Sequence, residues 1–328
     1  MKIFITGATG YIGSLLALRL AGSGKTVHAL VRDPRQTQFL EHSNIKLFQG
    51  DITNAESLRG AVEGCEQVYH VAALVKSWMK DTSVIYKTNV DGAKNVLEEA
   101  ICAGVKKIVF TSTCGVIGPS LKDPMTEKDP RIIGYSLDYE LSKKMAEDMI
   151  SQYVKNGVNA VIVSPSKVYG PGRISHSLTY NGVIKKFLQS GVAFIPYPGH
   201  YQGCFAYIDD VVNGHIRAME KGLAGEKYIL GGVNISYRHF FEQIKKIQGK
   251  GRIIEVSKFF IRAFACWQWV QSWAFHKDPL FGQEAVNHFY CDYIFSSQKA
   301  ISELGYHITP LEEGIQKTVQ FLNQNNHE

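Results

Sequence analysis

Short apolar runs alternate, along the first half of the chain, with longer stretches in which apolar residues recur at helical spacing. The short runs predict β-strands over 2–6, 26–32, 44–50, 67–72, 107–111 and 159–164. The longer stretches predict helices, most clearly over 11–22, 90–103 and 139–156. Strands separated by helices form βαβ units, whose right-handed crossovers place helices on both faces of a parallel sheet. The expected fold class is therefore α/β, with a doubly wound parallel sheet.

The second half of the chain is less regular and predicts a smaller region attached to the sheet. A helical pattern covers 211–221, a short strand covers 227–230, and mainly helical spacing follows from residue 236. We expect a sheet domain over 1–165 that is rejoined by about 205–230. The remaining stretches, 166–204 and 231–328, are expected to form a smaller, mainly helical region that selects the substrate.

Composition narrows the class of protein. The 328 residues carry a net charge of +6, and the basic residues are scattered, so no nucleic-acid partner is expected. The six cysteines include no CxxC pair, which argues against a metal site or a disulfide framework and favours a reducing compartment. The chain shows no signal peptide and no uncharged apolar run long enough to span a bilayer. The expected location is therefore the cytoplasm, with no transmembrane segment.

A glycine-rich turn follows the first predicted strand and opens the first predicted helix. Gly7 permits a tight turn, Gly10 lets a pyrophosphate approach the backbone, and Gly13 allows the helix to pack closely on the strand. The helix N-terminus adds free N–H groups and the positive end of the helix dipole. This strand–turn–helix context predicts a Rossmann-type dinucleotide site. The residues expected to meet the dinucleotide here are Gly7, Thr9, Gly10, Tyr11, Ile12 and Gly13.

The end of the second predicted strand indicates which dinucleotide is preferred. Sites for NAD usually carry an acid there for the ribose 2′-hydroxyl, but this chain has Val31 followed by Arg32. A guanidinium forms charge-assisted hydrogen bonds to a 2′-phosphate, so NADP(H) is expected in preference to NAD(H). Asp33 leaves an alternative open, since it could serve a ribose or start a turn with Pro34.

Two more strand ends are expected to lie along the cofactor. Asp51, followed by Ile52, comes directly after the third predicted strand. Its carboxylate could bond the adenine amino group or cap a helix. Ala72 and Ala73 come at the end of the fourth strand, where small side chains let the cofactor lie against the sheet edge.

A YxxxK pattern opens the helix predicted over 139–156. Tyr139 and Lys143 are four residues apart and share one helix face. Free tyrosine has a pKa of about 10, and a neighbouring ammonium lowers it, so Tyr139 is the candidate general acid/base for a carbonyl group. Thr113, with Ser112 as second choice, follows the fifth strand at the ligand edge, where a hydroxyl can bind that carbonyl.

The chain resembles the extended short-chain dehydrogenase/reductase family, within the NAD-dependent epimerase/dehydratase superfamily. The resemblance rests on TGATGYIG, HVAA, TNVDGAKNVL, TSTCGVIG, YELSK and SPSKVYGPG, which occur in the family's order over essentially the whole chain. The segments 30–34, 164–172 and 228–232 resemble the dihydroflavonol 4-reductase-like branch. The family usually has serine where Thr113 stands, and threonine keeps the hydroxyl. The resemblance also allows a homodimer formed through helices of the sheet domain.

The resemblance implies roles for particular residues. Thr113, Tyr139 and Lys143 would form the catalytic triad, and Lys143 would also hold the nicotinamide ribose. Asn89 would lie near the site, and the stretch from Ser164 to Val168 would pass the nicotinamide. The cofactor contacts expected around the reaction centre are Ser112, Tyr139, Lys143, Ser164 and Val168.

These features favour an NADPH-dependent reductase of an aldehyde or ketone. A nucleotide-sugar epimerase with retained NAD is the first alternative, which the missing acid at Val31 weakens. A dehydratase is disfavoured because Cys114 and Gly115 stand where an acidic pair would follow the catalytic hydroxyl. A non-catalytic NADP-binding regulator and a hydroxysteroid-type or lipid-type dehydrogenase remain as further alternatives.

An aromatic segment over 259–275 holds Phe264, Trp267, Trp269 and Trp273, and its apolar residues are not confined to one side of a helix. It could form the core of the small domain with a substrate lid, a dimer contact or a membrane-surface contact. We expect it to wall an apolar or aromatic pocket in part, and therefore expect an apolar or aromatic carbonyl substrate.

Overall fold

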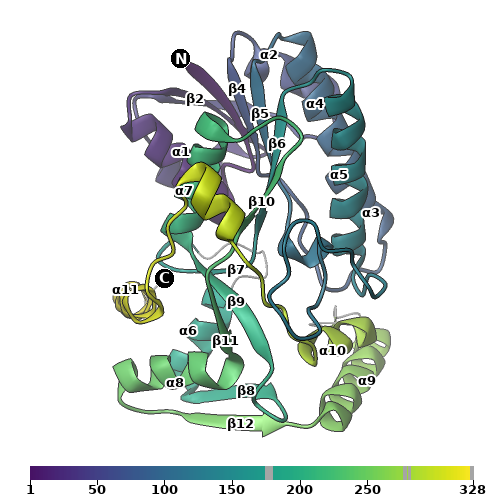
Figure 1. Ribbon diagram of the computed structural model, residues 1–328, viewed down its shortest axis with the longest axis vertical. Coiled ribbons are helices and arrows are strands. Elements are labelled where there is room, and N and C mark those ends of the chain that lie inside the picture. Colours follow the sequence, from purple (N-terminus) through teal and green to yellow (C-terminus); the bar gives the residue numbers. More distant parts are fainter. Residues whose placement is uncertain (174–179, 276–278, 280–281, 326–328) are drawn as a thin grey trace.

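The computed structural model describes residues 1–173, 180–275, 279 and 282–325. Its centre is a seven-stranded sheet in the order β10-β6-β5-β4-β1-β2-β3, and every strand pair in it is parallel (Figure 1). The strands are β1 (Lys2–Thr6), β2 (Thr26–Val31), β3 (Ile45–Gln49), β4 (Gln67–His70), β5 (Lys107–Thr111), β6 (Ala160–Pro165) and β10 (Lys227–Leu230). The predicted doubly wound α/β fold is confirmed.

Helices cover both faces of this sheet because its strands are apolar on both sides. In β1, Ile3 and Ile5 pack into one core with α1 (Tyr11–Gly22) and α7 (Ile208–Lys221). Phe4, between them, points into the other core. The helices on that second face are α2 (Arg59–Val62), α4 (Gly92–Cys102) and α5 (Asp138–Lys155).

A second region lies below the carboxyl edge of the large sheet in Figure 1. It holds two small sheets: β7 (Lys167–Tyr169), β9 (Gln202–Tyr207) and β11 (Val233–Ser236) form one, and β8 (Val192–Pro196) and β12 (Arg252–Val256) form the other. Its helices are α6 (Tyr180–Ser190), α8 (Tyr237–Gln248), α9 (Lys258–Phe275), α10 (Gln283–Phe289) and α11 (Leu311–Gln324). A further short helix, α3 (Ser83–Tyr86), precedes α4.

The boundary between the two regions is interleaved along the chain. β10 lies at the edge of the large sheet, beside β6, whereas β9 belongs to the small three-stranded sheet. Helices predominate beyond residue 231, but the two small sheets were not predicted, since strands of three to six residues give little period-2 signal. The proposed domain ranges remain a prediction, and they include stretches that lie outside the described residues.

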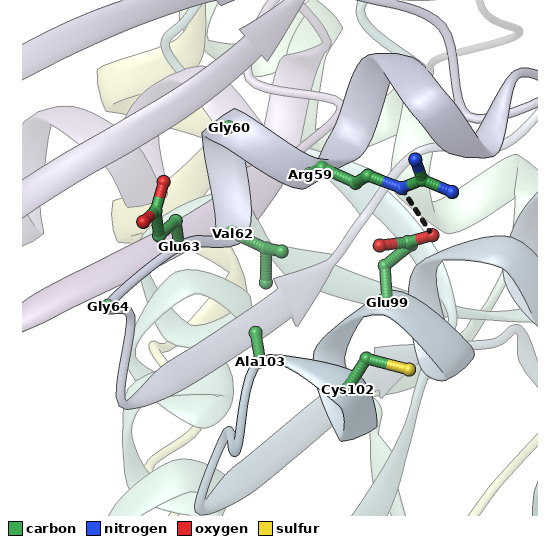
Figure 2. A pocket seen from close by; sticks show the side chains of 8 residues that line it. All are labelled: Arg59, Gly60, Val62, Glu63, Gly64, Glu99, Cys102 and Ala103. Atoms are coloured by element: carbon green, nitrogen blue, oxygen red, sulfur yellow. Dashed lines mark ion pairs between the residues drawn. The ribbon is translucent and has the colours of Figure 1, made fainter.

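Surface hollows occur at both edges of the large sheet. One hollow, of about 320 Å³, is lined by residues of α2 and α4 and of the turns that follow them. Figure 2 shows its lining, with Arg59 paired to Glu99, whose atoms lie 3.6 Å apart. Both helices lead into strands there, so this hollow lies at the amino edge. Ligands of such folds bind at the carboxyl edge, where the loops after β1, β2, β3, β4 and β5 meet. Among the described helices, none is long and apolar enough to cross a membrane.

Candidate active site

The turn between β1 and α1 leaves no room for side chains. Gly7 has a φ of +73°, and a Cβ on it would lie 2.6 Å from the backbone nitrogen of Ala72. A Cβ on Gly13 would lie 2.2 Å from the carbonyl oxygen of Gly7. Gly10 donates its N–H to that same oxygen at 2.9 Å and precedes a helix with no side-chain cap. A backbone cradle with an uncapped helix N-terminus fits the pyrophosphate of a dinucleotide.

The other residues of the turn differ in what their side chains do. Thr9 and Ile12 are partly exposed. Tyr11 is buried, and its hydroxyl donates to the carbonyl oxygen of Gly170 at 2.8 Å, which ties α1 to the loop after β7. Only the backbone of Tyr11 is therefore placed to serve a phosphate. Ala72 and Ala73 follow β4 and are partly exposed, and the N–H of Ala72 donates to the Thr6 hydroxyl at 3.3 Å.

The charged side chains that follow β2 have different partners in the structure. The Asp33 carboxylate accepts hydrogen bonds from the backbone and the guanidinium of Arg35, at 3.1, 2.9 and 3.0 Å, and caps the turn that begins at Pro34. Asp33 thus performs the turn-starting role that was one of its two expected alternatives. Arg32 is exposed, and among the described residues its guanidinium has no hydrogen-bond or ion-pair partner. It therefore stands available for an anionic group at this strand end.

Beyond β3, the structure excludes one of the two expected roles of Asp51. Its Oδ1 accepts from the backbone N–H and the hydroxyl of Thr53, each at 2.8 Å. The following 3₁₀ turn is capped by Asn54, so Asp51 is not the helix cap. Ile52 packs its side chain into the core under α4, and its carbonyl oxygen accepts from Asn95 at 2.8 Å. Only one carboxylate oxygen of Asp51 is therefore left for an adenine.

Tyr139, Lys143 and Thr113 come together where α5 begins beside the end of β5. Tyr139 is the second residue of α5, and the Thr113 side chain hydrogen-bonds its phenol. The Thr113 hydroxyl also accepts from the N–H of Gly115 at 3.1 Å, which fixes its position. Lys143 lies one turn along α5, almost fully buried, with its Nζ 4.2 Å from the centre of the Phe110 ring on β5.

Burial is the largest cause of the pKa shifts of Tyr139 and Lys143. It raises the pKa of Tyr139 to about 12, although the hydrogen bond to Thr113 acts in the opposite direction. It lowers the pKa of Lys143 to about 7, although the carboxylate of Glu147 acts in the opposite direction. The expected lowering of the phenol's pKa by an ammonium is therefore not what the structure gives. Tyr139 is a neutral phenol at neutral pH, which suits a proton donor.

Asn89 is held between the loop after β4 and α5. It is buried in a π-helical turn at Lys87–Asp91, where its side chain accepts from the N–H of Leu74 at 2.8 Å. Its amide nitrogen donates to the Leu74 carbonyl at 3.1 Å and to the Ser142 hydroxyl at 2.9 Å. Asn89 therefore ties the loop after β4 to α5.

Three other expected contacts lie in strands or directly after one. Ser112 is buried and donates its hydroxyl to Glu147, which also accepts from Lys227 of β10. Ser164 is fully buried in β6, and its hydroxyl has no hydrogen-bond partner among the described residues. Val168 lies in β7, paired with Ala206 of β9. The structure thus places Thr113, rather than Ser112, beside Tyr139.

A cavity of about 160 Å³ opens beside Thr113 and Tyr139. Its apolar walls are Val75, Leu137, Tyr293 and Phe295. Its charged or polar walls include Lys76, Glu140, Lys167 and His288. Lys167 places its Nζ 5.0 Å from the centre of the Tyr293 ring. His288, Tyr293 and Phe295 were missed by the sequence analysis, because they come from α10 and the segment after it, far from the YxxxK pattern.

A buried ion pair supports one wall of this cavity. Glu140, directly after Tyr139, pairs with Arg131 at 3.0 Å, and both side chains are less than one-tenth exposed. Arg131 also donates to the carbonyl oxygens of Gly115 and Gly134. Burial raises the pKa of Glu140, and Arg131 acts against that shift. His288 lies 3.5 Å from Glu140, and burial lowers its pKa to about 3, so it is neutral.

Arg131→Met is expected to destabilise the protein by about 3 kcal/mol, because it leaves the Glu140 carboxylate buried without its partner. Urea unfolding followed by circular dichroism measures the loss. Arg217→Met is the matched control, since it breaks the exposed pair with Glu220 and should cost less than about 1 kcal/mol. Equal losses for the two variants would contradict a structural role for the buried pair.

Comparison with known proteins shows the family of this chain. Residues 3–231 match the sequence model of the NAD dependent epimerase/dehydratase family. The chain is 30% identical over 258 residues to sterol demethylase protein B of Methylococcus capsulatus, covering 77% of this chain and 76% of that protein. It is 30% identical over 268 residues to a dihydroflavonol 4-reductase of Gerbera hybrida, covering 74% and 71%.

Among solved structures, UDP-glucose 4-epimerase from Thermotoga maritima matches with a TM-score of 0.82 over 100% of both chains, at 24% identity, and thus shares the fold. The expected resemblance is confirmed by the family match together with the curated relatives. The chain belongs to the NAD-dependent epimerase/dehydratase family and is an NAD(P)-dependent enzyme of the extended short-chain dehydrogenase/reductase type, with dihydroflavonol 4-reductases among its relatives.

Proposed function

We propose that this enzyme is an NADPH-dependent reductase of an aldehyde or ketone, acting in the cytoplasm, with an activity like that of its dihydroflavonol 4-reductase relatives. The observation that carries the proposal is the Tyr139 phenol, which lines the cavity beside the Thr113 hydroxyl. Because burial raises the pKa of Tyr139 to about 12, the phenol is protonated at neutral pH. A protonated donor is what carbonyl reduction requires.

The bound dinucleotide would supply the hydride to the carbonyl carbon. Thr113 would hold the carbonyl oxygen next to Tyr139, and Tyr139 would donate its proton to that oxygen. Lys143, on the same face of α5, titrates near neutrality and would stabilise the phenolate that remains. Asn89 would hold the loop after β4 against α5 while the proton moves.

The cavity walls favour an apolar or aromatic substrate. Tyr293 and Phe295 present rings to the cavity, and Val75 and Leu137 add aliphatic surface. The buried charge of Glu140 is held by Arg131, so it does not face the cavity as a free carboxylate. A carbonyl attached to an aromatic or aliphatic body fits these walls better than a sugar with many hydroxyls, which would lose hydration without gaining partners.

A panel of aldehydes and ketones, followed by loss of nicotinamide absorbance with NADPH or NADH, tests the proposal. We expect turnover of hydrophobic carbonyls with NADPH. A nucleotide-sugar epimerase would instead keep NAD⁺ through gel filtration and interconvert sugars without net oxidation. Finding tightly retained NAD⁺, epimerisation and no carbonyl reduction would overturn the proposal.

Arg32→Gln is expected to raise KM for NADPH by about 10- to 100-fold and leave KM for NADH nearly unchanged, because the lost interaction is a charge-assisted bond to the 2′-phosphate. Initial rates with each cofactor measure the change. Arg35→Gln is the matched control, since that guanidinium is held by Asp33. A larger effect from Arg35→Gln, or equal losses with both cofactors, would contradict the assignment of Arg32.

A further inference from the structure

Helix α9 exposes large apolar side chains along its length. Phe259 is 74% exposed, Phe260 65%, Trp267 53%, Trp269 63% and Val270 54%. Soluble monomers seldom gather so many large apolar groups at one place. Such a patch marks a surface that binds another protein or a membrane.

The opposite side of α9 packs normally. Ala265 and Gln268 are buried there, and α9 lies against α10. The helix is therefore anchored, and its exposed side chains project from a fixed support. The side chain of Trp273 lies outside the described residues.

The two-stranded sheet before α9 extends this apolar surface. Phe194 in β8 and Ile254 in β12 are register partners, 68% and 42% exposed. Their neighbours Ala193 and Ile195 are buried, so Phe194 and Ile254 occupy the outer face, where polar residues are usual. Figure 1 shows β8, β12 and α9 at one extreme of the molecule, far from the amino edge of the large sheet. We call this surface the aromatic end: Phe194, Ile254, Phe259, Phe260, Trp267, Trp269 and Val270.

The chain around the aromatic end is basic. Residues 245–275 contain six lysines and arginines and one acid, Glu255. That acid is paired with Arg238, and one of the six cations, Lys246, is paired with Glu312. A positive stretch beside exposed aromatic rings complements an anionic surface that has an apolar interior.

We infer that the aromatic end binds the surface of a phospholipid bilayer that contains anionic lipids. Tryptophan and phenylalanine insert at the boundary between headgroups and acyl chains, while lysine and arginine stay with the headgroups. Each basic residue near such a surface adds to the attraction. Lys258 and Arg262 interrupt the apolar sequence of α9, which suits a helix lying in the interface.

The position of the aromatic end has a consequence that rests on the proposed function. α10 packs against α9 and carries His288, which lines the cavity beside Tyr139. A hydrophobic carbonyl dissolved in the bilayer would therefore reach the cavity from the membrane side. Lipid binding itself does not depend on the reaction, so the two proposals can fail separately.

Flotation of the full-length protein with vesicles tests the binding. The probes are vesicles of phosphatidylcholine alone and of phosphatidylcholine with phosphatidylglycerol. We expect the protein to float with the anionic vesicles and to show a blue shift of its tryptophan emission, since three of its four tryptophans lie in 258–275. Absence of flotation on anionic vesicles would overturn the inference.

Two double variants locate the contact. Phe260→Glu with Trp267→Glu should lower the vesicle partition coefficient at least about tenfold, because it removes two inserted rings. Lys250→Glu with Arg252→Glu keeps the rings and should lower binding to anionic vesicles at least about tenfold, with little change on neutral ones.

Leu223→Glu is the matched control, since Leu223 is 63% exposed and precedes β10, in the other region of the fold. It should leave flotation unchanged, and circular dichroism checks that every variant is folded. Sedimentation velocity tests the alternative that the aromatic end is a dimer interface. A dimer that dissociates in the Phe260→Glu with Trp267→Glu variant, without any vesicle binding by the parent protein, would show that a second copy covers the aromatic end and would overturn the inference.

Discussion

Tyr139→Phe is expected to lower kcat for carbonyl reduction by roughly 10³-fold, because it removes only the hydroxyl that donates the proton. The ring remains, so the packing at the start of α5 and the cavity wall should persist. KM for the carbonyl and KM for NADPH should change little, since the phenol acts mainly in the transition state. Steady-state kinetics with the best substrate of the carbonyl panel measures all three quantities.

Tyr153→Phe is the matched control for this prediction. Tyr153 lies on the same helix, and its phenol also makes a hydrogen bond, to Glu98 at 2.6 Å, at the far end from the cavity. It should retain nearly full kcat. Full activity of Tyr139→Phe, or an equal loss in both variants, would remove the phenol from the proposed chemistry.

Lys143→Met is expected to abolish most activity and, at the same time, to stabilise the cofactor-free protein by about 4 kcal/mol at pH 7. Burial lowers the pKa of Lys143 from 10.5 to about 7 in the folded state. Between these two values the unfolded chain binds the proton and the folded chain does not, so folding releases a proton and the lysine destabilises the fold. Methionine has a similar volume and carries no charge.

The stability gain from Lys143→Met is expected to shrink as the pH rises. The destabilisation by Lys143 is fully present below the folded pKa of about 7 and fades as the pH rises toward the ordinary pKa of 10.5. The gain from Lys143→Met should therefore be large at pH 7 and small at pH 10, as measured by urea unfolding at both values. Lys144→Met, which breaks only the exposed pair with Asp148, should show neither effect. A gain that does not shrink with rising pH would contradict the buried-ammonium explanation.

The features that sequence reasoning predicted correctly depend on short-range spacing. The parallel sheet follows from alternating apolar runs and helical stretches, and the backbone cradle follows from glycines three residues apart. Tyr139 and Lys143 share a helix face because they are four residues apart, and β5 ends just before Thr113. The glycine spacing and the Tyr139–Lys143 spacing are each set within one element or one turn, and the alternation of strands and helices is visible along the chain, so the sequence carries these features directly.

The features that sequence reasoning missed depend on contacts between segments that are far apart in the chain. His288 and Tyr293 reach the cavity from the chain beyond α9, and no local pattern links them to Tyr139. Burial raises the pKa of Tyr139, and residue spacing does not reveal burial. The lowering that was expected from Lys143 therefore does not set the direction of the shift.

The place of β10 in the large sheet has a consequence for the order in which the site is made. This strand closes the edge of β6, and its Lys227 pairs with Glu147 on the catalytic helix. A nascent chain that has left the ribosome only as far as β6 has already produced Tyr139, Thr113 and the cofactor cradle. Its outermost strand still lacks a neighbour and Glu147 still lacks its cation, so these contacts can form only after synthesis has passed residue 230.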